Sequence, residues 1–401
     1  MVLTHAHLDH SGFLPVVVRS GFRGPVYCTA ATRDLLGILL PDSARLQEEE
    51  AEFANRHRYS KHSPALPLYT EADARQALQL LRPVEWFTRV SPARGLEAEF
   101  SPAGHLLGAA SVLVRSASCR ILFSGDLGRS DDPVMRPPTP PPVAEWVVIE
   151  STYGDRRHPA VDAESELAAL MSPVLQRGGV IVVPSFAVGR AQMLLHLITR
   201  LKARRAIADV PVFLNSPMAT DATHVYDMHR DEHRLTAAEC AAIRRTVRFV
   251  DSVEESKNLN RLTGPAIIVS ASGMATGGRV LHHLKAFAPD ERNLILFAGY
   301  QVAGTRGAAM LAGADTIKML GEYIPVRAGV AQLQGLSAHA DCDQLIAWLK
   351  SSAVASTQVF VTHGEPAASE SLALRIDSEL ALQVTVPAEG RTILLESHHR
   401  S

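Results

Sequence analysis

Short apolar runs rich in β-branched residues alternate with helix-like stretches between about residues 178 and 320. Four of these runs have the length and composition of buried strands: 180–183, 211–214, 266–269 and 294–297. Most are followed within a few residues by a stretch with helical periodicity: 191–202, 219–229 and 278–288. Strands that alternate with helices are typical of a parallel sheet with crossover helices. We therefore predict an α/β domain here.

The flanking segments have a different pattern. Residues 1–150 contain four short apolar runs, predicted as strands and separated by long polar or proline-rich connections: 26–29, 111–114, 120–123 and 146–149. The charged, periodic stretch 42–58 predicts an exposed helix with Asp42 or Ser43 as its N-cap. From residue 338 the pattern predicts a helix, a strand, a second helix and a final pair of strands: 342–350, 357–361, 366–381 and the chain beyond.

Composition limits the class of protein. With 401 residues, 46% hydrophobic and 20% charged, the chain is typical of a globular protein of two to three domains. No apolar run approaches the ~18 residues that span a bilayer, and the first residues do not resemble an export signal. The four cysteines form no CxxC pair and are typical of reduced thiols. We therefore expect a cytoplasmic protein with no membrane partner.

Net charge gives no sign of a nucleic-acid-binding protein at the level of the whole chain. The value of −2 provides no basic footprint, so any nucleic acid must be held by a local site. The unusual feature of the composition is the presence of 17 histidines.

Four metal-ligand residue types occur within six positions at the start of the chain: His5, His7, Asp9 and His10. They follow a short β-like run, and residues two apart on an extended segment point the same way, so His5 and His7 can converge on one ion. Asp9 and His10, beyond the turn, can face a second ion. Imidazole and carboxylate are ligands of Zn²⁺, so the motif predicts a zinc site.

Six residues cannot complete two coordination spheres, so further ligands are expected at the ends of other strands. His105 lies between glycines that let the backbone come close. Asp126 follows the run 121–123, where its carboxylate could bridge two ions, and His363 follows the run 358–361. Each of these alone is as often a structural residue, but together with the first motif they favour metal ligation.

Nine short motifs then occur in order along the chain: HxHxDH at 5–10, GH at 104–105, SGD at 124–126, ESTYGD at 150–155, GRAQ at 189–192, SASGM at 270–274, GTRG at 304–307, SAHAD at 337–341 and HGEP at 363–366. This very specific series resembles the β-CASP branch of the metallo-β-lactamase superfamily. It is most similar to the RNA-processing members related to the cleavage and polyadenylation endonuclease and to prokaryotic RNA-metabolising hydrolases. The resemblance runs from Val2 to the C-terminal strands.

The resemblance implies a fold and a division into domains. We expect an α/β protein in which a metallo-β-lactamase αββα sandwich, residues 1–154 and 338–401, is split by an inserted β-CASP domain, residues 155–337. Family members normally begin upstream of the first motif, so the first strands of the sandwich are expected to be missing. Loss of that support commonly weakens metal binding by about 10–100-fold and exposes a sheet edge.

The resemblance also implies roles for individual residues. His5, His7 and His105 resemble the ligands of one zinc ion, Asp9, His10 and His363 resemble those of a second, and Asp126 lies between the ions. Glu150 matches an acidic residue that the family pairs with a histidine, here His339. A histidine rather than a valine at position 363 goes with RNA substrates in this family.

This arrangement is chemically reasonable without the resemblance. Two Zn²⁺ roughly 3.5–4 Å apart can generate a hydroxide near neutral pH and neutralise a phosphate under attack. A leaving ribose oxygen needs a proton, and an imidazolium beside a carboxylate can donate one. We therefore predict Asp9, Glu150 and His339 as catalytic residues, with His339 as the general acid. A purely structural Glu150–His339 pair is the alternative.

Glycine-rich turns between predicted strands and helices are candidates for binding RNA phosphates, because free N–H groups at a helix start attract anions. The candidate residues are Arg190, Ser270, Ser272, Gly273, Arg279 and Arg306. Such turns are also common as connections with no binding role, and the arginines could instead brace the two domains.

We therefore expect a zinc-dependent ribonuclease that leaves a 5′-phosphate and a 3′-hydroxyl. Two alternatives stay open: a small-molecule zinc hydrolase of the thioesterase or lactamase type, and a non-catalytic RNA-binding partner. The inserted domain with Glu150 and His339 argues against the first. The complete ligand set argues against the second, which only the short N-terminus favours. A homodimer is compatible with the sequence, which decides neither the oligomeric state nor endonucleolytic against exonucleolytic cleavage.

Overall fold

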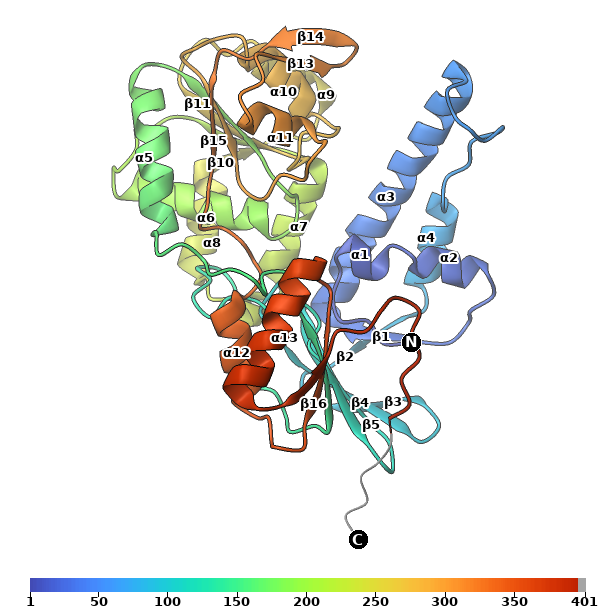
Figure 1. Cartoon of the computed structure of the whole chain (residues 1–401). Coiled ribbons are helices and arrows are strands. Elements are labelled where there is room, and N and C mark those ends of the chain that lie inside the picture. Colours follow the sequence, from blue (N-terminus) through green and yellow to red (C-terminus); the bar gives the residue numbers. More distant parts are fainter. Residues whose placement is uncertain (396–401) are drawn as a thin grey trace. The chain divides into compact units, whose positions relative to one another are not determined.

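The computed structural model describes residues 1–395 and divides the chain into two units. The first unit consists of Met1–Arg157 together with the part of the chain that begins at His339. The second unit, His158–Ala338, is inserted between these two parts, so the blue and red ends of the chain belong to the same unit (Figure 1). No helix among the described residues is both long and apolar enough to cross a membrane.

The first unit contains a seven-stranded sheet in the order β17-β16-β7-β6-β5-β4-β3. From one edge to the other these strands are β17 Gln383–Thr385, β16 Gln358–Thr362, β7 Trp146–Glu150, β6 Arg120–Phe123, β5 Ala110–Arg115, β4 Leu96–Pro102 and β3 Arg89–Ala93. Strands β17, β16, β7 and β6 are parallel, and β5 runs antiparallel to both β6 and β4. The ends of β4, β6, β7 and β16 therefore lie at the same edge.

A second, two-stranded sheet of the first unit is formed by β1 Val26–Thr29 and β2 Leu81–Val84. Val2 forms a parallel bridge to Tyr27 of β1. The helices of this unit are α1 Leu8–Ser11, α2 Leu14–Arg19, α3 Ala30–His57, α4 Glu71–Leu78, α12 Cys342–Lys350 and α13 Pro366–Leu380. Helix α13 contacts β16, β17 and α12, so it covers the parallel end of the large sheet.

The second unit has the parallel α/β architecture that the sequence predicts. Its six-stranded sheet has the order β10-β9-β11-β8-β12-β15, and every neighbouring pair is parallel. The strands are β8 Val180–Pro184, β9 Val212–Asn215, β10 Val247–Phe249, β11 Ala266–Ser270, β12 Leu294–Phe297 and β15 Gly329–Gln332. Every residue of β8 and β11 is buried, which is why these strands are continuous apolar runs.

Seven α-helices join or flank these strands: α5 Ala163–Gln176, α6 Arg190–Ala203, α7 Pro217–Met228, α8 Ala237–Thr246, α9 Val253–Leu259, α10 Val280–Phe287 and α11 Arg306–Leu311, with a short 3₁₀ helix at Arg230–Glu232. An antiparallel hairpin, β13 Thr316–Met319 and β14 Glu322–Pro325, precedes β15.

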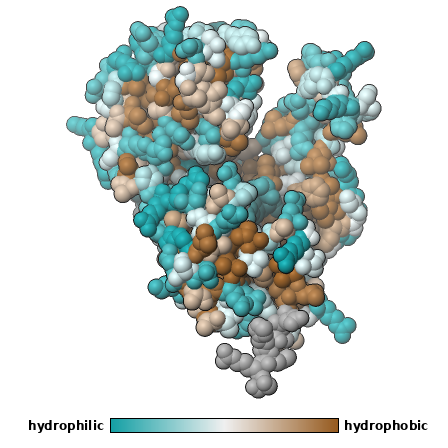
Figure 2. Space-filling model, viewed as in Figure 1, coloured by the Kyte–Doolittle hydropathy of each residue, from teal (hydrophilic) through white to brown (hydrophobic). Residues whose placement is uncertain are grey.

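The charged stretch 42–58 is not a separate helix, so the prediction of an N-cap at Asp42 or Ser43 is wrong. Helix α3 begins at Ala30, where the Thr29 side chain accepts a hydrogen bond from the Thr32 N–H. Its first half is buried through leucines at 35, 36, 39 and 40, and alanines continue the buried face beyond Pro41. One lost hydrogen bond at the proline is therefore outweighed by packing on both sides of it. Figure 2 shows that hydrophobic residues also reach the surface in this region.

Several strands carry no clear signal in the sequence. Strands β2, β3, β4 and β10 and the β13–β14 hairpin are partly exposed or very short, so their apolar alternation is weak. The predicted final pair of strands is wrong within the described residues, because residues 381–395 contain a single short strand, β17.

Candidate metal centre

The first motif leads from an extended segment into a short helix. The Thr4 carbonyl accepts a hydrogen bond from the Ala110 N–H at the start of β5, with N···O 2.9 Å. Helix α1 then begins at Leu8, with His7 as its N-cap. His5 and His7 therefore lie on extended backbone, whereas Asp9 and His10 lie on the first turn of α1.

Three further side chains reach this place from the shared edge of the large sheet. His105 lies in the connection from β4 to β5, Asp126 follows β6, and His363 follows β16. Because these strands end at one edge, side chains more than 200 residues apart in sequence, such as Asp126 and His363, lie 3.5 Å apart at their closest nitrogen and oxygen atoms. The sheet order explains the convergence.

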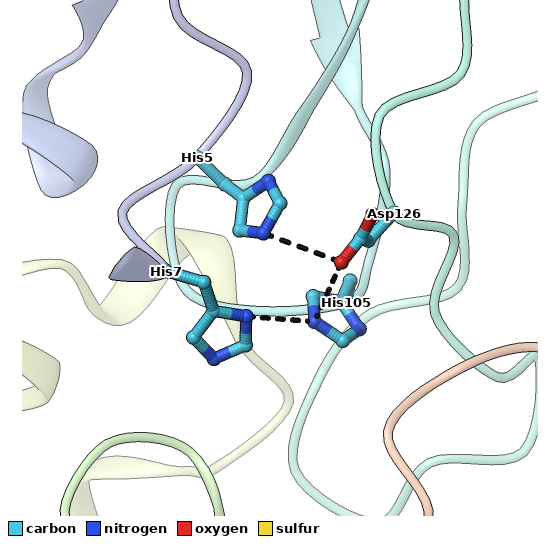
Figure 3. A group of neighbouring side chains, drawn as sticks. All are labelled: His5, His7, His105 and Asp126. Atoms are coloured by element: carbon cyan, nitrogen blue, oxygen red, sulfur yellow. Dashed lines mark hydrogen bonds and ion pairs between the residues drawn. The ribbon is translucent and has the colours of Figure 1, made fainter. Parts of the chain in front are cut away.

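The inner cluster consists of His5, His7, His105 and Asp126, and Figure 3 shows their side chains pointing toward one another. His7 Nδ1 lies 3.1 Å from His105 Nε2. Asp126 Oδ2 lies 3.4 Å from His5 Nε2 and 3.6 Å from His105 Nε2. Ligand atoms ~2.1 Å from a tetrahedral ion are about 3.4 Å apart, so these separations fit a single zinc ion.

The outer cluster consists of Asp9, His10 and His363. His10 Nε2 lies 2.9 Å from His363 Nε2 and 3.6 Å from Asp9 Oδ2. The second oxygen of Asp126, Oδ1, lies 3.3 Å from His10 Nε2. The Asp126 carboxylate thus presents Oδ2 to the inner cluster and Oδ1 to the outer cluster, which is the arrangement of a bridging ligand.

Buried polar atoms without a hydrogen-bond partner support metal binding. Within residues 1–395, His5 Nε2 and Asp126 Oδ1 are buried and make no hydrogen bond. Leaving a buried polar atom unpaired costs about 1–3 kcal/mol, so a native structure usually gives such atoms a partner. A cation between the side chains would satisfy both atoms, and imidazole and carboxylate are suitable donors for zinc.

The electrostatics of the inner cluster also suit a cation. Burial lowers the pKa of His5 and His105, and burial with the neighbouring His5 lowers the pKa of His7 to about 3. These imidazoles are therefore neutral at pH 7, and neutral imidazole is the form that binds metal. Burial opposes ionisation of Asp126, but interactions with His10 and His5 hold the pKa of its carboxyl far below the usual range.

In the outer cluster the Asp9 carboxylate raises the pKa of His363 to about 9. The same pair holds the pKa of Asp9 below its ordinary value, although partial burial opposes this. In the protein without metal, His363 therefore carries a proton at pH 7, and a bound cation would displace it.

Two threonines support the histidines from outside the clusters, and the sequence reasoning did not assign them a role. Thr4 Oγ1 lies 3.2 Å from His5 Nδ1, and Thr152 Oγ1 lies 3.3 Å from His363 Nδ1. Thr152 Oγ1 also donates a hydrogen bond to the carbonyl of His363 at 3.1 Å. Hydrogen bonds to the non-ligating nitrogen of a histidine fix its ring orientation. The sequence feature that could have pointed to them is their position, because Thr4 directly precedes the HxHxDH motif and Thr152 lies within the ESTYGD motif.

Glu150 and His339, predicted as a pair, are in contact. His339 Nδ1 lies 3.0 and 3.1 Å from the two carboxylate oxygens of Glu150. The buried Glu150 carboxylate also accepts hydrogen bonds from the N–H groups of Leu127 at 2.7 Å and Thr152 at 3.2 Å. Burial lowers the pKa of His339, but the charge and hydrogen bond of Glu150 outweigh it, so the net pKa is raised.

His339 lies directly beside the inner cluster. Its ring centroid is 4.3 Å from that of His105, and the Tyr153 ring stacks on it at 6.3 Å. The backbone bridge between Gly128 and His339 holds this segment against the loop after β6. A Cβ atom at Gly128 would lie 2.0 Å from the Gly104 carbonyl oxygen, so glycine is required where these loops cross.

The predicted phosphate-binding residues lie in the second unit. Ser270 ends β11, and its buried hydroxyl donates to the Asn215 carbonyl at 2.9 Å. Ser272 and Gly273 follow in the next loop, where the Ser272 hydroxyl lies 2.9 Å from that of Thr276. The Ser270 hydroxyl is therefore used within the unit, whereas Ser272 is half-buried on a partly exposed loop.

The three arginines occupy the loop and helix starts of the second unit. Arg190 begins α6. The Arg279 guanidinium donates to Asn215 Oδ1 at 3.0 Å and to the Val250 and Asp251 carbonyls at 3.1 and 2.5 Å. Arg306 donates to the carbonyls of Thr276 at 3.0 Å and Lys318 at 2.8 Å. Arg279 and Arg306 thus tie loops of their own unit together, and Arg306 places its cation beside the 271–279 loop.

Three family models match successive parts of the chain. The metallo-beta-lactamase superfamily matches residues 1–170, the Beta-Casp domain matches residues 191–310, and the Zn-dependent metallo-hydrolase RNA specificity domain matches residues 323–387.

Several known proteins align with nearly the whole chain. "Ribonuclease TTHA0252" of Thermus thermophilus is 37% identical over 374 residues, which cover 91% of this chain and 81% of that protein. "Transcription termination factor FttA" of Methanosarcina mazei is 30% identical over 412 residues, covering 98% of this chain but only 63% of the factor. A crystal structure of a protein of unknown function from Enterococcus faecalis shares the fold, with a TM-score of 0.53 at 15% identity, covering 98% of this chain and 80% of that one.

The domains, their order and the clustered ligands define a metal-dependent hydrolase. The chain belongs to the metallo-β-lactamase superfamily, in the branch that carries a β-CASP domain.

Proposed function

We propose that this protein is a zinc ribonuclease that hydrolyses RNA phosphodiester bonds at the inner and outer clusters, each of which holds one Zn²⁺. The observation that carries the proposal is the Asp126 carboxylate, whose two oxygens face different clusters at 3.3–3.6 Å from His5, His10 and His105. A bridging carboxylate of this kind favours two ions over one.

When bound, a pair of zinc ions would supply a hydroxide at neutral pH and neutralise the phosphate. Asp9, His10 and His363 line the more exposed cluster, where a substrate phosphate has access. Asp9 is the most exposed of the candidate ligands, with a side chain 64% accessible, so it can reorient when substrate arrives.

His339 donates the proton to the leaving ribose oxygen. The Glu150 carboxylate is hydrogen-bonded to His339 Nδ1, so Nε2 is the atom that releases the proton. The two backbone N–H groups that donate to the Glu150 carboxylate fix it in place, and its contact with His339 favours the imidazolium form of His339. Product ends are then a 5′-phosphate and a 3′-hydroxyl.

Several observations support RNA as the substrate. The RNA specificity domain matches residues 323–387, which include His339 and His363. One relative is named as a ribonuclease, and another is named as a transcription termination factor. In the proposal, residues 1–154 and 338–401 supply the metal site, and the β-CASP domain at 155–337 holds the RNA. None of these observations favours a small-molecule hydrolase or a non-catalytic partner.

The test is RNA hydrolysis by zinc-loaded His339→Ala, with zinc content measured on the same sample. Loss of a general acid lowers the rate by about 10²–10⁴-fold, while zinc content stays at the wild-type value. His282→Ala, an exposed histidine outside both clusters, is the matched control and keeps full activity. Full activity of His339→Ala with wild-type zinc content would overturn the assignment of the acid.

A further inference from the structure

Two exposed aromatic side chains follow neighbouring strands of the second unit, outside the residues discussed so far. Phe186 lies two residues after β8 and is 47% exposed, and Tyr300 lies three residues after β12 and is 56% exposed. Because β8 and β12 are paired in parallel, both side chains lie beyond the same, carboxyl edge of the sheet. An exposed aromatic ring offers a flat apolar face that can stack on a ligand.

The sheet topology marks this place as a binding position. After β8 the chain passes through α6 to β9 on one side of the sheet order, whereas after β12 it passes through α11 toward β15 on the other side. The chain therefore turns in opposite directions after two adjacent strands. In open α/β sheets, ligands bind at the carboxyl ends of the strands at such a switch point.

Three loops are bonded into one surface around the two rings. A Cβ atom at Gly273 would lie 3.1 Å from the Phe186 ring, so glycine lets the loop after β11 pack directly on Phe186. The buried Gln301 side chain donates to the Gly273 carbonyl and to the Gly299 carbonyl, both at 3.1 Å. Gln332 of β15 donates to the Gly299 carbonyl at 3.0 Å. The loops that carry Phe186 and Tyr300 are therefore connected through the loop after β11.

The charge and polarity of the surrounding loop fit a polyanion. Arg306 donates to the Thr276 carbonyl, which places a positive charge beside the 271–279 loop, whereas the Arg279 guanidinium is directed to the Val250 carbonyl after β10. The hydroxyls of Ser272 and Thr276 lie on the same loop. Aromatic rings beside arginines and hydroxyls are the elements with which proteins hold single-stranded nucleic acid, since rings stack on bases and cations follow the backbone.

We propose that Phe186 and Tyr300 form a base-stacking platform for single-stranded RNA, with the 271–279 loop beside it contacting phosphate. The inference rests on the proposed function, because it takes the ligand to be RNA. The platform binds any base through its flat face and gives little sequence preference. The platform selects unpaired RNA over duplex RNA, since bases in a duplex are not free to stack on protein.

The test measures RNA binding by the full chain after a chelator has removed its metal. The probe is a short single-stranded oligoribonucleotide that carries 2-aminopurine, whose fluorescence is quenched by stacking. Phe186→Leu and Tyr300→Leu remove a ring but keep an apolar side chain. Each is expected to weaken binding about tenfold and to reduce quenching. Phe186→Tyr and Tyr300→Phe retain a ring and restore both signals. Tyr323→Leu, an exposed tyrosine on β14, is the matched control and binds like wild type.

A parallel measurement separates the platform from the hydrolytic site. Hydrolysis of bis(p-nitrophenyl) phosphate, which has no base or ribose, is expected to stay unchanged in the zinc-loaded Phe186→Leu and Tyr300→Leu proteins. If wild type binds the oligoribonucleotide and both leucine variants bind it within twofold of wild type, the platform is wrong while the proposed function stands. If wild type binds no RNA at all, the platform and the RNA assignment are both wrong.

Discussion

Thr152 is the residue whose contribution to the metal site is easiest to isolate. Its hydroxyl contacts both Nδ1 and the carbonyl of His363, and His363 adopts a left-handed backbone conformation with φ 57°. This conformation raises the free energy of a non-glycine residue, so neighbouring contacts must stabilise it. The next residue, Gly364, packs against Ser151, where a Cβ atom would lie 2.3 Å from the hydroxyl oxygen.

We therefore expect Thr152→Ala to release His363 and to weaken zinc binding at the outer cluster about 10–100-fold. Competition with a chromophoric chelator measures this, and zinc affinity at the inner cluster should be unaffected. Thr88→Ala, which removes an exposed threonine hydroxyl, is the control. Equal zinc affinities in Thr152→Ala and wild type would show that the hydroxyl does not position His363.

At the residue scale the sequence contains the ligand types but not their supports. His5 and His7 could be predicted to converge because alternation on extended backbone is a local property. The roles of Thr4 and Thr152 could not, because a threonine hydroxyl is a common residue whose partner is decided by tertiary contacts. The buried state of Ser270, which uses its hydroxyl within the sheet, is a similar case.

At the scale of single elements, the start of α3 depends on Thr29. Its hydroxyl accepts the Thr32 N–H and donates to the Gly108 carbonyl at 2.7 Å, which joins the helix to the loop that carries His105. Thr29→Ala is expected to lower the free energy of unfolding by ~1–2 kcal/mol, and Thr29→Ser, which keeps the hydroxyl, to restore most of it. Urea denaturation measures both, and equal losses in the two variants would contradict the capping role.

His283 connects α10 with β9 and α9 through buried hydrogen bonds. Its Nε2 lies 2.7 Å from Asn215 Nδ2 and its Nδ1 lies 2.6 Å from Asn260 Oδ1. Burial, with smaller contributions from His282 and Arg279, lowers the pKa of His283 from 6.5 to about 4. The unfolded chain therefore binds a proton more readily than the folded chain as the pH falls through this window.

This shift predicts an acid-labile second unit. Stability from His283 is complete above pH 6.5 and is lost as the pH falls toward 4, by about 3 kcal/mol in total. Urea denaturation at pH 7 and pH 4.5 should show a smaller difference in unfolding free energy for His283→Gln than for wild type. The exposed neighbour offers the control, His282→Gln, which should keep the wild-type difference. The same pH dependence in all three proteins would rule out His283 as its source.

At the scale of the whole molecule, regular alternation made the second unit predictable and long-range contact made the first one difficult. Each of the strands β8 to β12 is followed by a helix, so local periodicity reveals the order of these elements, and buried strands such as β8 and β11 appear as apolar runs. In the first unit, β4 has mixed burial, so its apolar alternation is weak and the sequence did not predict it.

The large sheet brings β6, β7 and β16 side by side although the second unit lies between β7 and β16 in the chain. Periodicity cannot reveal the pairing of β7 with β16, because the paired residues, such as Trp146 and Gln358, are more than 200 positions apart. The motif order and the family resemblance suggested the meeting of Asp126 and His363 in advance. The sheet then supplies the physical reason, since parallel neighbours end at one edge.

Zinc content per chain, measured by elemental analysis after removal of loosely bound metal, tests the central claim most directly. We expect about two zinc ions per chain in the wild type and about one in His105→Ala and in His363→Ala, because each variant disrupts one cluster. Asp126→Ala, which removes the shared carboxylate, should lose zinc from both. One zinc or none in the wild type, or a wild-type content in Asp126→Ala, would contradict a paired-zinc site at these seven residues.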